Sequence, residues 1–364
     1  MSCQLAITSM SLGRCYAGHS FVHKLDMAHA YGYKGIELFH EDLADFAQQL
    51  PLPNSPSTRE RELGAARIVR KLCRERGISI VCLQPFMHYE GLLDRQEQAR
   101  KLEKLQFWFQ LARALGTDMI QIPSSFGPAE ELSDDMDVIV RDLQKVADMG
   151  LQCNPPVRFV YEALCFGTRW NKWEQSWEIV QGVDRPNFGI CLDTFNIAGR
   201  VYADPASPTG RTPDCEEATK ESIARLVRHI DVEKVFYVQV VDAERLSSPV
   251  VPGHEFFDPS QSARMSWSRN CRLFYGERDR GAYLPIEDIS RAIFQGLGYR
   301  GWVSMELFHR RMADADPGVP RELASRGAVA WKKLVGDMGL SMTTTSPIAE
   351  EKKKTDMGIL SASL

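Results

Sequence analysis

The chain has 364 residues, of which 44% are hydrophobic, and its formal net charge is −4. This length predicts one large domain, and the slightly acidic balance excludes the basic field that binding a nucleic-acid backbone requires, so we expect a small-molecule substrate and no nucleic acid. There is no run of about 18 apolar residues and no basic start followed by an apolar core, and the nine cysteines form no CxxC pair, so we expect a cytoplasmic protein with no membrane partner.

Short apolar segments alternate with amphipathic ones along the chain. In chain order, the predicted strands are 4–13, 35–39, 78–84, 117–123, 157–162, 187–196, 235–241 and 302–306. The predicted helices between and after them are a helix end at 27–33, then 58–76, 96–115, 133–149, 172–180, 216–229, 286–296 and 320–338. Gly77, Gly116 and Gly150 follow the predicted helices 58–76, 96–115 and 133–149 as stop signals. Ser133 is the predicted N-cap of the helix 133–149.

Eight strands, each followed by a helical segment, predict a (β/α)8 barrel over residues 1–340. Two unrelated domains are the less economical alternative. Residues 201–214 and the loop 242–284 after the seventh strand interrupt the regular spacing, and loops of this length in a compact domain are usually lids or binding loops. The polar tail 341–364 is predicted to be disordered.

Four predicted strands end in oxygen-bearing side chains. They are Glu162, Asp193, Gln239 and Glu306, at the ends of the fifth to eighth strands. Strand ends of a barrel meet at one face, and hard cations such as Mg²⁺ or Mn²⁺ prefer oxygen ligands. The pattern therefore predicts a divalent metal site. Taken alone, however, any one acid at a strand end is more often a loop residue that pairs with an arginine.

Two further groups of residues stand where they could meet a substrate. Ser268, Arg269 and Arg272 in MSWSRNCRLF could clamp a carboxylate, or could form a solvated basic turn. In LQPFMHYEG, the residues placed at the active face are Gln84, His88, Tyr89 and Glu90.

His88 is the leading candidate for an acid or base, although a lone histidine is more often structural. His254 and His309 are further candidates for that role. The aromatic residues Phe166, Trp170 and Trp173 could form an apolar wall, or could be plain core.

The sequence resembles a known family in an ordered set of motifs. GIELF, LQPF, YEAL, CLDTFNIAGR, SRNCR and MELF are similar to the 3-dehydroshikimate dehydratases of fungal quinate catabolism, within the xylose isomerase-like TIM barrel superfamily, over about residues 4–338. The resemblance implies conversion of 3-dehydroshikimate to protocatechuate and water, with a divalent metal held by Glu162, Asp193, Gln239 and Glu306. It also implies that Ser268 and Arg272, which match an SRxxR element, bind the substrate.

The chain departs from some bacterial members of this family at two places. Those members have DTFH where this chain has DTFN, so Asn196 replaces a histidine proposed as the base, and PFRDFEG where this chain has PFMHYEG. We therefore hypothesise that His88 transfers the proton and that Asn196 hydrogen-bonds substrate or a metal-bound water. Gln84 is expected to contact substrate, and Arg272 to hold the ring carboxylate.

Other functions remain open at this point. A metal-dependent sugar isomerase or epimerase could use the same barrel, since fold alone does not decide the reaction. A DNA repair nuclease is disfavoured by the acidic charge and the lack of histidines at the other strand ends, and a silent barrel that binds a small acid is a further alternative. A homo-oligomer is compatible with the sequence.

Overall fold

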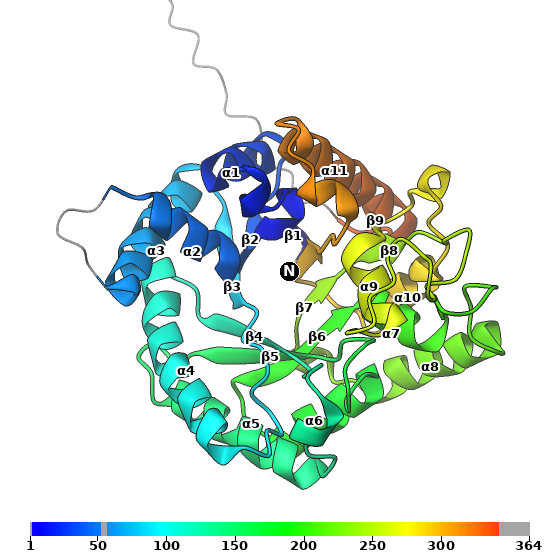
Figure 1. The fold of residues 1–364 in the computed structure, drawn as a ribbon, viewed down its shortest axis with the longest axis horizontal. Helices are drawn as coiled ribbons and strands as arrows, with labels where there is room; N and C mark the ends of the chain where they lie inside the picture. The colour runs from blue at the N-terminus through cyan, green and yellow to red at the C-terminus, as the bar shows by residue number, and fades with distance from the viewer. Residues whose placement is uncertain (1, 52–56, 342–364) are drawn as a thin grey trace, which may run out of the picture.

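The computed structural model describes residues 2–51 and 57–341. Its central feature is a closed barrel of parallel strands in the order β1, β10, β7, β6, β5, β4, β3, β2. Figure 1 shows this barrel down its axis, with the helices in a ring around it. The predicted (β/α)8 fold is therefore confirmed. The predicted disordered tail, apart from Ser341, lies outside the described residues.

Each barrel strand coincides with a predicted apolar segment. The strands are β1 (Gln4–Thr8), β2 (Gly35–Phe39), β3 (Ser79–Gln84), β4 (Met119–Pro123), β5 (Arg158–Glu162), β6 (Phe188–Asp193), β7 (Val235–Gln239) and β10 (Trp302–Met305). Every residue of β4 and of β6 is buried, because helices cover the barrel outside and side chains fill it inside. The first strand is shorter than predicted, since residues 9–12 turn into a short 3₁₀ helix.

The covering helices are also close to the predicted ones. They are α1 (Phe21–Ala30), α3 (Thr58–Glu75), α4 (Arg95–Leu115), α5 (Met136–Leu151), α6 (Trp173–Val183), α8 (Cys215–His229), α10 (Ile286–Arg291) and α11 (Val319–Met338). Their ends follow capping rules: Ser57 and Glu60 form a capping box before α3, and Gly116 closes α4 in a left-handed conformation. The predicted N-cap Ser133 was wrong, because the side chain of Asp135 accepts the Asp137 N–H instead.

Several elements were not predicted, among them three helices. The additional helices are α2 (His40–Gln49), α7 (Thr194–Val201) and α9 (Ala263–Asn270). The segment 242–284 was expected to be a long loop, yet it contains α9 and the strand β9 (Arg272–Phe274). Strand β9 pairs antiparallel with β8 (Val241–Ala243), which continues directly from β7. Within the described ranges, no helix combines the length and apolarity needed to cross a bilayer.

Candidate active site

Three carboxylates meet inside the barrel at the carboxyl ends of β5, β6 and β10. Oxygen atoms of Glu162, Asp193 and Glu306 all lie within 4.8 Å of one another, and all three residues are buried. These strands are separated in the barrel only by β7, which ends in Gln239. The fold therefore brings Glu162, Asp193 and Glu306 together, as the sequence predicted.

The start of α7 holds two of these acids in place. Asp193 is the N-cap of α7, and its Oδ1 accepts the backbone N–H of Phe195 at 2.8 Å. One turn into the helix, the Asn196 amide donates to Asp193 Oδ2 at 2.6 Å and to Glu162 Oε1 at 2.8 Å. Its own carbonyl accepts the Cys165 N–H at 2.9 Å, which fixes the orientation of the amide. Asn196 therefore bridges the acids, and its amide protons are already used.

Gln239 is oriented by an acid that the sequence analysis did not single out. Its amide nitrogen donates to both carboxylate oxygens of Glu37 on β2, at 3.2 and 3.0 Å. Glu37 also accepts from Gln84 at 2.8 Å, and Gln84 reaches Glu306 Oε1 at 3.3 Å. With its nitrogen committed to Glu37, Gln239 is left with a buried Oε1 that has no hydrogen-bond partner in the described part of the chain.

The electrostatics of the cluster favour a bound cation. Burial, and then the charges of Glu306 and Asp193, raise the pKa of Glu162 well above its ordinary range. Burial also raises the pKa of Glu306, to about 8, against the lowering effect of Arg272. Buried carboxylates ionise readily only when positive charge compensates them.

The residues present fit a hard divalent metal. Glu162, Asp193 and Glu306 offer carboxylate oxygens, and the unpartnered Oε1 of Gln239 on the intervening strand offers an amide oxygen. Buried polar atoms are nearly always hydrogen-bonded. The Gln239 Oε1, which has no hydrogen-bond partner in the described residues and belongs to the strand between β6 and β10, therefore fits the role of a metal ligand. No thiol belongs to this group, which disfavours a soft-metal site.

Arg272 lies against the same acids. The pairing of β9 with β8 folds the long segment back over the barrel, so that Arg272 is only 2% exposed. Its Nη1 donates to Asp193 Oδ2 at 3.0 Å and to Glu306 Oε2 at 3.1 Å, and its Nη2 and Nε contact Ser268 Oγ at 3.2 and 3.4 Å. The rings of Phe195 and Phe308 lie 4.1 and 4.9 Å from the guanidinium carbon. The predicted solvated basic turn is therefore excluded for Arg272.

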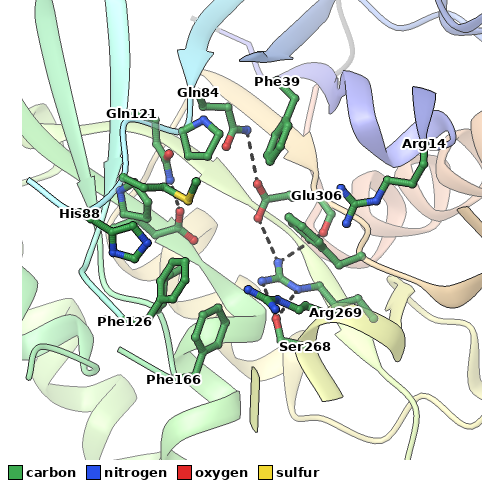
Figure 2. A pocket seen from close by; sticks show the side chains of 17 residues that line it. Arg14, Phe39, Gln84, His88, Gln121, Phe126, Phe166, Ser268, Arg269 and Glu306 are labelled. Carbon is green, nitrogen blue, oxygen red and sulfur yellow. Dashed lines mark hydrogen bonds and ion pairs between the residues drawn. The ribbon is translucent and has the colours of Figure 1, made fainter. Parts of the chain in front are cut away.

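A cavity of about 420 Å³ opens above the acids. Polar and apolar groups share its wall: Glu162, Glu306, Gln84, Gln121, His88, Ser268, Arg272, Arg14, Arg269, Phe39, Phe126, Phe166, Phe308, Leu164, Met87, Pro85 and Pro123. Figure 2 shows His88, Phe126 and Phe166 on one side of this space, with Glu306, Ser268 and Arg14 facing them. Of the predicted aromatic wall, Phe166 lines the cavity, whereas Trp170 and Trp173 belong to the core.

His88 reaches the cavity from a strained turn. Its φ is +57°, a left-handed conformation that is uncommon for residues other than glycine. Its Nδ1 lies 3.2 Å from Ser125 Oγ, and its ring packs edge-on against Phe126. Burial, and then the charge of Lys101, lower the pKa of His88 to about 4. His88 is therefore a neutral imidazole near pH 7.

Other predicted candidates lie away from this cavity. His254 Nδ1 accepts the Phe256 N–H, and His309 Nδ1 accepts the Arg311 N–H, so both act as local caps. The hydroxyl of Tyr89 donates to the backbone carbonyl of Asp142, which makes it structural. Glu90 is buried behind the wall, where its Oε1 accepts the Ser125 N–H at 2.6 Å and thereby fixes the residue that contacts His88.

The sequence analysis missed Glu37, Gln121 and Arg14. Glu37 and Gln121 each interrupt an apolar strand with a polar side chain, the same signal that identified the metal-site acids. Gln121 donates to Glu162 Oε2 and so orients that carboxylate. Arg14, by contrast, follows the first strand in a short connection and carries no recognisable sequence signal.

Comparisons with known proteins agree with the barrel fold. A family model described as a xylose isomerase-like TIM barrel matches residues 25–333. A 3-dehydroshikimate dehydratase of Neurospora crassa is 61% identical over 342 residues, which are 93% of this chain and 95% of that protein. A Pseudomonas aeruginosa protein of the same name is 29% identical over 288 residues, which are 79% of this chain but 36% of that longer protein.

Solved structures show a similar fold. A xylose isomerase-like TIM barrel/4-hydroxyphenylpyruvate dioxygenase fusion protein superposes with a TM-score of 0.68 at 26% identity. The match covers 93% of this chain and 43% of the fusion protein. The chain therefore corresponds to less than half of the length of that fusion protein.

Proposed function

The chain belongs to the xylose isomerase-like TIM barrel family, and within it to the group that contains the Neurospora crassa 3-dehydroshikimate dehydratase, and from this we propose that it removes water from 3-dehydroshikimate to give protocatechuate. This reaction makes the protein a hydro-lyase. The observation that carries the proposal on the structural side is the cluster of Glu162, Asp193 and Glu306 beneath a cavity sized for a small ring.

We propose that Mg²⁺ or Mn²⁺ is the cofactor, held by Glu162, Asp193, Gln239 and Glu306. The support is an all-oxygen donor set and the orphaned Gln239 Oε1. Such an ion supplies Lewis acidity toward a ketone oxygen and the hydroxyl beside it. Asn196, Gln121 and Glu37 hold the ligand side chains in place through the hydrogen bonds described above.

His88 is proposed to move the protons. As a neutral imidazole in the cavity wall, it can take the proton from the carbon between the ketone and the leaving hydroxyl. The C–O bond to the 5-hydroxyl then breaks, and the same imidazolium can return its proton to the departing oxygen as water forms. Tautomerisation then gives the aromatic diol: the ring methylene loses one proton and the ketone oxygen gains one, so atoms and charges balance.

The pH dependence of this base follows from its environment. An ordinary histidine with a pKa of 6.5 would be half protonated near that pH, whereas the lowered pKa of about 4 keeps His88 unprotonated above about pH 5. We therefore expect NMR titration of labelled histidines to show one ring, absent in His88→Asn, that does not protonate between pH 8 and 5. A midpoint near 6.5 for that ring would contradict this account.

Arg272 is proposed to bind substrate beside the metal as well as to neutralise the acids. Arg272→Ala leaves Asp193 and Glu306 without their buried cationic partner and removes a wall of the cavity. We expect the KM to rise by about 10- to 100-fold, since hydrogen bonds to charged groups contribute roughly 1.5–3 kcal/mol. Steady-state kinetics at saturating Mg²⁺ measure this, and an unchanged KM would show that Arg272 does not contact substrate.

The proposed reaction has a direct test. Purified protein mixed with 3-dehydroshikimate and Mg²⁺ or Mn²⁺ should produce the ultraviolet absorbance of a catechol. A sugar isomerase or epimerase on this scaffold would leave 3-dehydroshikimate unchanged and would interconvert ketoses, and a barrel that only binds an acid would do neither. Absence of the catechol signal with a properly folded, metal-supplemented protein would reject the proposed function.

The compartment is proposed from the thiols. All nine cysteines are described, and all are free. Seven of them are buried near or within the core with a raised pKa, as expected of inert thiols in a reducing environment: Cys3, Cys73, Cys82, Cys165, Cys191, Cys215 and Cys271. We therefore propose that the enzyme works in the cytoplasm.

A further inference from the structure

The proposed substrate has two chemically different ends, and this inference rests on the proposed function. If the ketone and its neighbouring hydroxyl lie at the acid cluster, the ring carboxylate is on the opposite edge of the six-membered ring. The group that binds this carboxylate must therefore face the cavity at a distance from Glu162, Asp193 and Glu306.

Arg272 is poorly placed for that task. One of its nitrogens is shared between Asp193 and Glu306, and the other two face Ser268. Stacking between Phe195 and Phe308 fixes its plane. Arg272 therefore lies at the acid end of the cavity, and its nitrogens are already engaged by Asp193, Glu306 and Ser268.

Two other guanidinium groups line the same cavity. Arg14 follows the short connection after β1, is anchored by its backbone N–H to the Met312 carbonyl at 2.8 Å, and packs over Phe308 with its guanidinium carbon 5.8 Å from the ring. Arg269 comes from the end of α9 and packs over Phe126 at 6.0 Å. Figure 2 shows Arg14 on the side of the cavity opposite His88, and Arg269 beside Ser268.

Neither guanidinium is fully neutralised. Arg269 donates to the neutral Gln261 amide at 2.7 Å, and no carboxylate within the described residues forms an ion pair with it. Arg14 pairs with Glu41 at 3.2 Å, but that acid is 40% exposed at its side chain and lies outside the cavity wall. Partial burial and the charge of Arg14 lower the pKa of Arg269, against the raising effect of Asp258, so the two cations that line this cavity repel each other.

We infer that Arg14 and Arg269 form the subsite for the ring carboxylate, and that they set the enzyme's preference for acidic over neutral cyclic substrates. A carboxylate between them would relieve the repulsion between the two cations and accept charge-assisted hydrogen bonds from both. Phe126 and Phe308, which support the two guanidinium groups, would at the same time cover the faces of the ring.

Binding of two ligands that differ only in the carboxylate tests this inference. Protocatechuate and catechol share the diol that faces the acids, so the ratio of their dissociation constants isolates the carboxylate. We expect the Mn²⁺-loaded wild-type protein to prefer protocatechuate by about 10- to 100-fold, measured by calorimetry. Arg269→Gln should reduce this ratio by about tenfold, and Arg14→Gln/Arg269→Gln should bring it close to one, with catechol affinity unchanged.

A structural role would give a different pattern. Variants that merely distort the cavity would weaken both ligands equally and leave the ratio intact, which would overturn the inference. Arg280→Gln is the matched control, because Arg280 is half exposed, pairs with Glu277 and lies outside the cavity wall. Arg269→Lys keeps a charge without the bidentate fork and should fall between wild type and Arg269→Gln.

A kinetic comparison separates this inference from the proposed function. The wild-type kcat/KM should be higher for 3-dehydroshikimate than for its methyl ester, and the double variant should lose that difference. If wild type converts 3-dehydroshikimate but the double variant keeps the full preference for the acid, the subsite is elsewhere while the function stands. If wild type converts neither compound yet prefers protocatechuate to catechol through Arg14 and Arg269, the subsite stands and the function fails.

Discussion

Glu306→Gln is expected to reduce turnover by about 10²- to 10³-fold or more and to weaken Mn²⁺ binding, without destabilising the metal-free protein. The substitution keeps the size of the side chain but removes one of three converging charges. Burial and the charges of Glu37 and Asp193 raise the pKa of Glu306 to about 8 although Arg272 lowers it, so without the metal this carboxyl is largely protonated near pH 7 and resembles the amide that replaces it. The unfolding temperature of the metal-free variant should therefore equal or exceed that of wild type.

Added cation provides the second measurement. A ligand at about 100 times its dissociation constant stabilises a protein by about 2.7 kcal/mol, so wild type should melt at a higher temperature with Mn²⁺ and Glu306→Gln should respond much less. Glu244→Gln is the control, since Glu244 pairs with Arg310 outside the cavity wall. Wild-type turnover that survives exhaustive chelation, or a Glu306→Gln variant with normal turnover, would contradict the metal site.

His88→Asn is expected to lower kcat by about 10²- to 10⁴-fold, the usual contribution of a general acid or base. Asparagine is the informative replacement, because it tolerates the left-handed φ of +57° while lacking a group that accepts a proton near pH 7. Mn²⁺ affinity and the unfolding temperature should stay near the wild-type values. His88→Ala should lose as much activity, with an added cost in stability from the strained backbone.

His254→Asn is the control for this experiment, because His254 caps a local turn and does not line the cavity. It should keep wild-type turnover. Nearly full kcat in both His88 variants would show that another group transfers the proton. Asn196 could not replace it, because a carboxamide is not basic near neutral pH and this one is held by Glu162 and Asp193.

The barrel and the acid cluster could be predicted from sequence for one physical reason. Strands covered by helices must be continuously apolar, so a polar residue at the end of such a run stands out, as Asp193 does in FGICLD. Parallel strands then bring their carboxyl ends to one face, and residues far apart along the chain meet there. Glu37 is likewise a polar residue within an apolar strand, GIELF. In the folded chain it accepts hydrogen bonds from the Gln239 amide and so orients that side chain.

The arrangement of segment 242–284, which follows the seventh barrel strand, could not be predicted in the same way. Segment 242–284 has no long apolar run, and its arrangement depends on β9 adding to β8 and on the backbone bond from the Arg272 N–H to the Phe308 carbonyl at 3.0 Å. These contacts join residues distant in sequence and leave no periodic pattern. The prediction that Arg272 holds a substrate carboxylate therefore took no account of its ion pairs with Asp193 and Glu306.

The most direct test of the account is a crystal structure of the protein grown with Mn²⁺, measured at the manganese absorption edge. We expect one strong anomalous peak inside the barrel, bound by oxygen atoms of Glu162, Asp193, Glu306 and Gln239 at about 2.0–2.3 Å. The Gln239 Oε1 should be among its ligands, which would explain its lack of a partner. A peak elsewhere, or none at saturating Mn²⁺, would contradict the central claim that these four side chains form a metal site.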